Sequence, residues 1–245
     1  MIQVLHRAFN ILEILALEPN KEFGLSEIAD KLQLNHGTCA NILRTMVNRG
    51  YIEQTGVKKG YKLGYMVYRL INSNSYNAEI VNAAQIPLEN LRNEINENVI
   101  LSIISNDKRV LLKSLVSSHE IQSRATKEKS VYSATTGRLI LAFYSPKDLN
   151  DFIKRVGLPS KEDWPEVKTQ NDLYKLLEEI REKKMAFTHN KNHVIGFATP
   201  IFKNNKVVAS IGVYLPSFRC GVVEEKRIIN AIKETTKLIN EELNY

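Results

Sequence analysis

The sequence predicts two domains of different fold class: a small, mainly α-helical N-terminal domain that ends in a β-hairpin, and a larger α+β domain with an antiparallel sheet. Three observations predict this division. The chain has 245 residues, which is long for one average domain and comfortable for two. Helical periodicity dominates residues 1–71, whereas the remainder alternates paired apolar runs with amphipathic helices. An Asn/Ser cluster at residues 72–75 separates the two patterns.

The N-terminal segment predicts an amphipathic helix that packs on a core. Its apolar residues recur at three-four spacing: Val4, Leu5, Ala8, Ile11, Leu12 and Leu15. Arg7 and Glu13 lie within this stretch, which argues against a secretory signal. A second helix, about two turns long, is expected in GLSEIADKL, with Ser26 as its N-cap.

A tight turn is predicted at Asn35-His36-Gly37, followed by a third helix that Thr38 caps or opens and that Gly50 ends. Helical spacing turns one set of residues inward: Ile42, Leu43, Met46 and Val47. It leaves another set outside: Asn41, Arg44, Thr45, Asn48 and Arg49. Two strand-like runs flanking TGVKKG then predict a hairpin wing. This order of elements indicates a winged helix-turn-helix over residues 1–64, whose third helix would enter the major groove of DNA.

The charge distribution agrees with a DNA-binding surface. The chain carries a formal charge of +7, which makes a polyanionic partner plausible. Between Asn35 and Arg69, Glu53 is the one acidic residue, against the cations Arg44, Arg49, Lys58, Lys59, Lys62 and Arg69. We expect Arg44, Lys58, Lys59 and Lys62 to contact phosphates. Base edges or flanking phosphates are expected within reach of the start and outer face of the third helix: His36, Gly37, Thr38, Asn41 and Thr45.

Residues 65–76 are predicted to form a helical linker, and residues 77–245 the second domain. A helix containing Pro87 comes first, and then two apolar runs flank Asn106-Asp107-Lys108, which is a hairpin signal. A further strand is expected at Glu120 to Thr126. Three helices follow, and then two strands joined by KNNK and a final amphipathic helix. Hairpins mixed with helices indicate an α+β domain with an antiparallel sheet.

Several segments together resemble one protein family. GLSEIADKLQLNHGTCANILRTMVNRGYIEQTGVKKGYKLG is similar to the DNA-binding domain of IclR-type bacterial transcriptional regulators, above all in its GY, wing and Y-x-L-G order. TTGRLILA resembles the family's T-x-G-K/R-x-x-L-A segment, and FATPIFKNNKVVASIGVYLPSFR resembles its A-A-P-I-F to P-x-x-R ending. The chain departs from the family at Cys39 and Asn41, and it has THNKNHV where an acidic run is usual.

The resemblance implies that the second domain is a GAF-like sensor of a small organic acid or aromatic metabolite. The pocket residues that it implies are Thr135, Thr136, Gly137, Thr188, His189, Asn190, Gly196, Gly212 and Tyr214. Residue chemistry independently supports the first three, because a glycine at a helix start leaves amide groups available to an anion.

Other chemistry finds little support in the sequence. His189 and His193 are four residues apart, but their segment does not predict a helix and no third ligand accompanies them, so no metal site and no cofactor are expected. No catalytic motif occurs, so we do not expect an enzyme. Cys39 and Cys220 fit no disulfide framework, and no apolar run reaches the ~20 residues of a membrane helix, which favours a cytoplasmic protein without membrane partners.

The leading hypothesis is therefore a transcriptional regulator whose operator binding responds to a small-molecule effector. One winged helix makes few base contacts, so a homodimer or homotetramer on double-stranded operator DNA is expected. Two alternatives remain open. One is a constitutive DNA-binding repressor whose sensor domain has lost its ligand. The other is an enzyme that uses the N-terminal domain for assembly.

Overall fold

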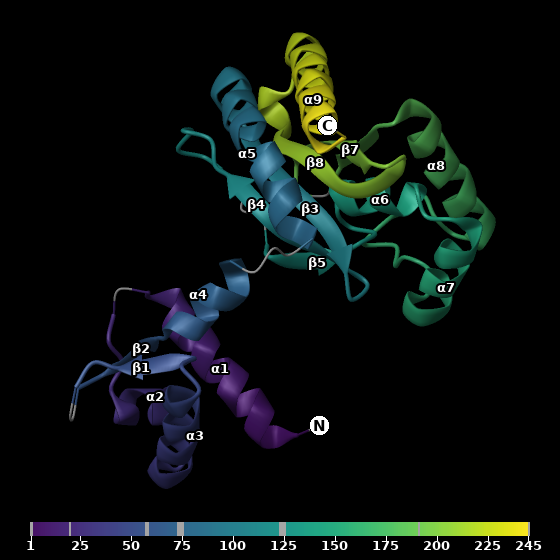
Figure 1. Cartoon of the computed structure of the whole chain (residues 1–245). Coiled ribbons are helices and arrows are strands. Elements are labelled where there is room, and N and C mark those ends of the chain that lie inside the picture. Colours follow the sequence, from purple (N-terminus) through teal and green to yellow (C-terminus); the bar gives the residue numbers. More distant parts are fainter. Residues whose placement is uncertain are drawn as a thin grey trace. The chain divides into compact units, whose positions relative to one another are not determined.

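The computed structural model forms two compact units, Met1–Ser75 and Tyr76–Tyr245 (Figure 1). It describes residues 2–19, 21–56, 59–72, 76–122, 126–190 and 192–244. Within these ranges, no helix combines the length and the apolar character that crossing a bilayer requires.

The first unit is three helices, a two-stranded wing and a fourth helix. Its elements are α1 (Gln3–Leu17), α2 (Leu25–Lys31), α3 (His36–Asn48), β1 (Ile52–Gln54), β2 (Tyr61–Leu63) and α4 (Tyr65–Asn72). The first three helices, β1 and Phe23, which precedes α2, share one apolar core: Ile11, Leu15, Phe23, Ile28, Ala29, Cys39, Ile42, Leu43, Met46 and Ile52. Val4 and Leu5, predicted to face this core, each remain 52% exposed. The predicted stripe on α1 is therefore buried in its second half only.

The turn between α2 and α3 lies earlier than the sequence predicts. It occupies residues 32–35, where Gln33 takes a left-handed φ of 52°. Asn35 is the N-cap of α3, and its side-chain oxygen accepts a hydrogen bond of 2.8 Å from the Gly37 amide. The prediction that Thr38 opens α3 is wrong, because asparagine is favoured both in turns and at N-caps and the pattern does not separate these roles.

Of two other predicted helix ends, the start of α2 is wrong and the end of α3 at Gly50 is confirmed. Ser26 lies inside α2, which begins at Leu25 after Gly24, so the predicted N-cap is wrong by two residues. Gly50 follows the C-cap Arg49 and has a φ of 73°. Glycine adopts this left-handed conformation without strain, which explains why the helix stops there.

The second unit is a six-stranded antiparallel sheet with helices on both faces. Its helices are α5 (Tyr76–Ile95), α6 (Thr135–Ala142), α7 (Pro146–Val156), α8 (Gln170–Lys183) and α9 (Val222–Leu243), with a 3-10 turn η1 (Ser217–Arg219). Its strands are β3 (Asn98–Ser105), β4 (Lys108–Leu115), β5 (Glu128–Ser130), β6 (Ala186–His189), β7 (Val194–Lys203) and β8 (Lys206–Pro216). The order across the sheet is β5-β4-β3-β8-β7-β6.

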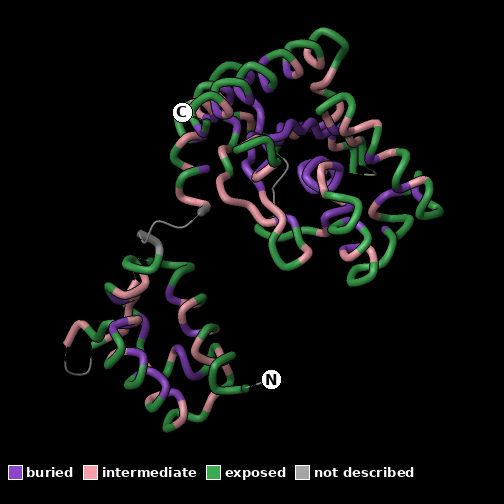
Figure 2. Tube along the Cα trace, turned by 45° about the vertical axis from the view of Figure 1, so that its right-hand side comes forward, coloured by how far each residue is buried: buried purple, intermediate pink, exposed green. Residues whose placement is uncertain are grey.

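Alternation along the central strands divides the sheet into two faces. Val99, Leu101, Ile211 and Val213 join the core beneath α5 and α9. Ile100 and Gly212 between them face α6, which is buried from Thr136 to its end (Figure 2). The helix α6 is thus held between the sheet and α8, and its N-terminal turn lies against β7 and β8.

The strand predicted at Glu120 to Thr126 is not present among its described residues. Side chains hold the chain here as a loop: just before the predicted strand the Ser117 amide donates to Asn98 Oδ1 at 2.9 Å, and within it the Ile121 carbonyl accepts from Arg219 Nη1 at 3.0 Å. The outer strand β5 begins at Glu128 instead and pairs with β4. These loop contacts come from residues distant in sequence, so no local pattern could reveal them.

The remaining architecture agrees with the prediction. Both hairpins predicted for the second domain form, and their turn residues Asn106, Asp107, Asn204 and Asn205 all have positive φ, as a type I′ turn requires. The fold class, a winged helix-turn-helix followed by an α+β domain with an antiparallel sheet, is confirmed.

Candidate functional site

The helix α3 buries one face and exposes a polar, basic one. Ile42, Leu43 and Met46 are buried, whereas Asn41, Arg44, Thr45, Asn48 and Arg49 are exposed, which confirms the predicted faces. Among the described residues, the Arg44 guanidinium makes no ion pair. The helix therefore presents a cation and amide side chains on a rigid support.

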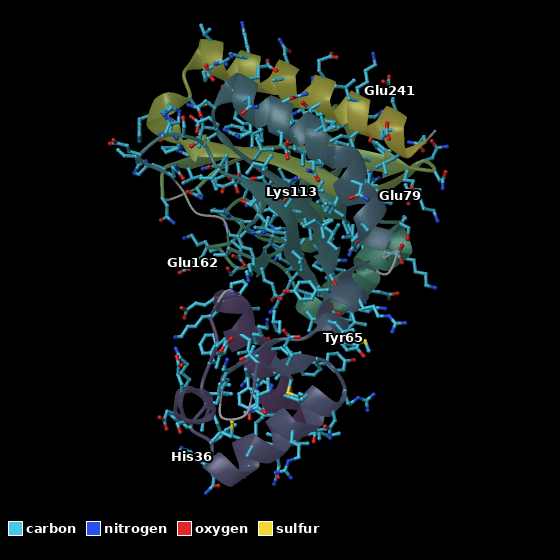
Figure 3. All side chains as sticks on the ribbon, turned by 60° about the vertical axis from the view of Figure 1, so that its left-hand side comes forward. His36, Tyr65, Glu79, Lys113, Glu162 and Glu241 are labelled. Carbon is cyan, nitrogen blue, oxygen red and sulfur yellow. The ribbon has the colours of Figure 1, made fainter. Side chains whose placement is uncertain are left out.

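The start of α3 is also accessible. His36, labelled in Figure 3, is exposed in the first turn, and its Nε2 lies 3.9 Å from Asp30 Oδ1. Thr38 is half-buried. The Gly37 amide is already occupied by Asn35, so Gly37 offers a close approach rather than a free donor.

Cys39 lies on the inner side of α3 and is fully buried. Burial raises the pKa of its thiol, so it stays protonated and unreactive at neutral pH. The side chain at this position therefore belongs to the core and not to the outer face of the helix.

The wing carries cations of unequal availability. The Lys59 side chain is exposed, and no ion pair of its ammonium occurs within the described part of the chain. Lys62 lies directly across from Glu53 in the hairpin register, with 2.7 Å between Nζ and Oε1, and this hydrogen bond raises the pKa of the lysine. Lys58 lies outside the described residues. Lys59 is thus better placed than Lys62 to contact a phosphate.

The second unit contains a cavity of about 390 Å³ where the N-terminal turn of α6 meets the sheet. This volume lies within the ~300–1,000 Å³ typical of small-molecule sites. Residues from the predicted effector set line it: Thr135, Thr136, Thr188, Asn190, Gly196, Gly212 and Tyr214. Apolar side chains complete its walls, including Ile100, Val194 and Phe197.

Two residues of the predicted effector set do not line the cavity. A methyl group on Gly137 would lie 2.4 Å from the Val131 carbonyl oxygen, so this glycine lets α6 pack against the preceding chain. His189 follows Thr188 on β6 and is exposed, because successive side chains of a strand point to opposite faces. We therefore exclude Gly137 and His189 from the candidate site.

The glycines of the cavity also have a packing role. An added Cβ on Gly196 would lie 2.3 Å from Thr135 Oγ1, and one on Gly212 would lie 2.6 Å from Thr136 Cγ2. Without these glycines α6 could not approach the sheet. The two threonines are consequently held at the cavity wall, where Thr135 Oγ1 and Thr188 Oγ1 are 2.5 Å apart.

Two cations of this cavity, Arg109 on β4 and Lys129 on β5, were not predicted from the sequence. Arg109 is 3% exposed and its Nη1 donates to the Thr126 carbonyl at 2.9 Å. Burial lowers the pKa of its guanidinium, an effect that Tyr214 partly opposes. Lys129 keeps solvent contact, yet surrounding protein atoms and then the Arg109 charge lower its pKa. The one sequence signal that could have indicated Arg109 is its position as a charged residue at the start of a largely apolar strand.

The side chains that usually bind metal ions in proteins are those of His, Cys, Asp and Glu. Within the described ranges, no three of them gather in a geometry that could hold a metal ion.

Comparison with protein families assigns both units. Residues 4–56 match the IclR helix-turn-helix domain, and residues 74–241 match the C-terminal domain of the bacterial transcriptional regulator IclR. Both are domains of DNA-binding transcriptional regulators. The chain therefore belongs to the IclR family.

Curated relatives are similar along nearly the whole chain. The HTH-type transcriptional regulator KdgR of Escherichia coli (strain K12) is 22% identical over 246 residues, covering 98% of this chain and 92% of that protein. The HTH-type transcriptional regulator TtgV of Pseudomonas putida is 27% identical over 227 residues, covering 89% and 83%.

Solved structures share the fold. The IclR protein of Thermotoga maritima has a TM-score of 0.74 at 22% identity, with 100% of both chains covered. An IclR homologue from Microbacterium hydrocarbonoxydans, solved in complex with 4-hydroxybenzoate, has a TM-score of 0.77 at 19% identity, with 98% of both chains covered.

Proposed function

We propose that this regulator binds operator DNA in a sequence-specific way and that a small organic acid or aromatic metabolite in the α6 cavity modulates the binding. The observation that carries the proposal is the presence, in one chain, of an exposed basic helix face and a ligand-sized cavity lined by threonines and cations. The cavity favours this function over a constitutive repressor without a ligand.

On DNA, α3 lies in the major groove and the wing lies beside it. Base edges or flanking phosphates are contacted by His36, Thr38, Asn41 and Thr45, with Gly37 permitting close approach. Arg44, Lys58, Lys59 and Lys62 contact phosphates, which give affinity without sequence information. The Thr45 hydroxyl donates to the Asn41 carbonyl at 2.9 Å, so Thr45 offers its methyl group and a hydroxyl lone pair.

In the cavity, the ligand contacts Thr135, Thr136, Thr188, Asn190, Gly196, Gly212 and Tyr214. The 4-hydroxybenzoate complex of the Microbacterium homologue supports an acidic ligand by analogy. The regulator acts in the cytoplasm as a homodimer or homotetramer, because a two-fold operator compensates for the few bases that one α3 reads.

Salt dependence of DNA binding tests the DNA-binding half of the proposal. Arg44→Ala combined with Lys59→Ala should weaken binding to an operator, selected from genomic fragments, and reduce the slope of log K against log salt by about one unit for each phosphate that is no longer neutralised. Lys237→Ala is the matched control, since it removes an exposed lysine from α9 in the other unit. Equal operator affinity for the double variant and the control would refute the assigned interface.

Thermal-shift screening tests the effector half. A ligand present at ~100 times its Kd should stabilise the protein by about 2.7 kcal/mol. If no small acid or aromatic compound raises the melting temperature while operator binding is intact, the constitutive repressor is the correct interpretation.

A further inference from the structure

We propose that the ligand of the cavity is a dianionic organic acid, with one anionic group bound between Arg109 and Lys129 and the other at the N-terminal turn of α6. This inference rests on the proposed function, because it names the chemistry of the effector. It follows from the two cations, their surroundings and the N-terminal turn of α6, which also lines the cavity.

Arg109 and Lys129 form a like-charged pair. They are directly opposite in the antiparallel register of β4 and β5, so their side chains project from the same face of the sheet. Like charges in this arrangement are destabilising. Both residues line the cavity, where an anion between them would remove the repulsion.

The Arg109 side chain has unused hydrogen-bonding capacity. It is 3% exposed, and within the described part of the chain its Nε has no hydrogen-bond partner. A buried polar group without a partner is uncommon and costly. A carboxylate or phosphate oxygen is the acceptor that a guanidinium binds best, so the orphaned donor points to an anionic ligand.

The protein itself supplies little compensating charge. No aspartate or glutamate is among the described residues that line the cavity. Asp163 acts on Lys129 from outside the lining, and its carboxylate accepts a hydrogen bond of 3.1 Å from Ser130 Oγ. The nearby Arg138 differs, since its guanidinium donates to the carbonyls of Tyr132 and Asp163 at 2.6 and 2.7 Å. Two positive charges therefore remain for the ligand to neutralise.

The N-terminal turn of α6 forms a second anion-binding end. The N-cap Ala134 has no side chain that could accept from the first amides, and the first turn contains no acidic residue. Thr136 lines the cavity, and its Oγ1 is buried without a partner among the described residues. Free amides and an unused hydroxyl suit a carboxylate.

The lining also contains apolar residues, including Ile100, Val194 and Phe197. They favour a carbon chain or ring that joins the two anionic groups. Dicarboxylates and phosphorylated carboxylic acids both carry two anionic groups, although a phosphate brings up to one further negative charge, and the experiment separates them.

The test compares acids of matched length on the full chain by calorimetry and thermal shift. Succinate, glutarate and adipate are measured against butyrate, pentanoate and hexanoate, and 2-phosphoglycolate against glycolate. The best dianion should bind about ten- to a hundredfold more tightly than its monoanionic partner, as expected for one added charge-assisted contact. A larger affinity ratio for dicarboxylate over monocarboxylate indicates a carboxylate at Arg109 and Lys129. A larger ratio for 2-phosphoglycolate over glycolate indicates a phosphate there.

Lys129→Gln and Arg109→Gln should remove this preference for dianions. The ligand-free melting temperature of Lys129→Gln should be unchanged or higher, because the like-charge repulsion disappears, whereas a merely structural lysine would lower it. Lys108→Gln is the control, since Lys108 pairs with Glu128 at 3.0 Å and does not line the cavity.

Equal affinity for dianions and monoanions, or an unchanged preference in both variants, would overturn the inference alone. No binding by any acid would overturn it together with the acid effector of the proposed function. The proposed function fails differently: it fails if an acid binds in the cavity but leaves operator affinity unchanged.

Discussion

Gly212 illustrates how a single residue fixes the geometry of the cavity. Its hypothetical Cβ would lie 2.6 Å from Thr136 Cγ2 and 3.0 Å from Ile100 Cγ1. The first distance is shorter than carbon atoms tolerate and the second is tight, so an added methyl group must push α6 away from β8 or displace the Thr136 side chain.

Gly212→Ala should therefore destabilise the fold by about 1–3 kcal/mol, the usual cost of overpacking, and weaken ligand binding. Urea unfolding measures the first effect and calorimetry the second. Gly221→Ser is the control: Gly221 has open space within 4 Å and is the N-cap of α9, where serine is favoured, so we expect a change within about 0.5 kcal/mol. Equal stability of the two variants would show that α6 does not depend on this close approach.

At the residue scale, the sequence predicted surfaces better than cavities. The faces of α3 followed from helical spacing, which a sequence displays directly. Arg109 and Lys129 were missed because their meaning depends on the pairing of β4 with β5, which are separate segments of the chain. His189 was placed in the pocket by resemblance, although its strand turns it to the other face.

At the scale of elements, local signals identified most helices and both hairpins but placed several boundaries wrongly. The turn before α3 was shifted because Asn35 serves as a cap. The outer strand is predicted at Glu120 to Thr126, but β5 begins at Glu128. The prediction is wrong because Asn98 and Arg219, whose side chains come from other parts of the fold, hold the preceding segment as a loop. Tertiary contacts of this kind override local preference.

The helix α8 offers a prediction about pH. Its capping box joins Thr169 and Asp172: the Thr169 hydroxyl accepts from the Asp172 amide at 3.2 Å, and Asp172 Oδ2 accepts from the Thr169 amide at 2.8 Å. The Thr169 hydroxyl and then the amides of Thr169 and Lys168 hold the pKa of Asp172 below its ordinary value of 3.8.

Because the folded-state pKa is lowered, ionised Asp172 stabilises the fold above pH 3.8, and this contribution disappears as the pH falls through the lowered pKa. Asp172→Asn should thus be less stable than the natural protein near neutral pH, and the difference should narrow in acid. Urea unfolding across this range measures it. A difference independent of pH contradicts the assignment, and in a Thr169→Ala background the pH dependence should be smaller.

At the scale of the whole molecule, the two units meet different tasks. The first presents α3 and the wing, and the second holds the cavity. Regulation requires that the ligand prefer one state of the protein over another, since a ligand that binds both states equally shifts nothing. The family and the fold class could be inferred from the sequence. The positive charge of the cavity could not, because it becomes apparent only once the pairing of β4 with β5 is known.

The coupling that we propose between operator and acid must be thermodynamically reciprocal. If the acid weakens operator binding by a given factor, the operator must weaken acid binding by the same factor. Typical couplings are about 1–3 kcal/mol, or roughly 5- to 150-fold.

The most direct test measures operator affinity by fluorescence anisotropy, with and without a saturating concentration of the best-binding acid at constant ionic strength. We predict a change in Kd of roughly fivefold or more, in either direction, that is abolished in Lys129→Gln. An operator Kd that stays the same while calorimetry shows the cavity to be filled would contradict the account.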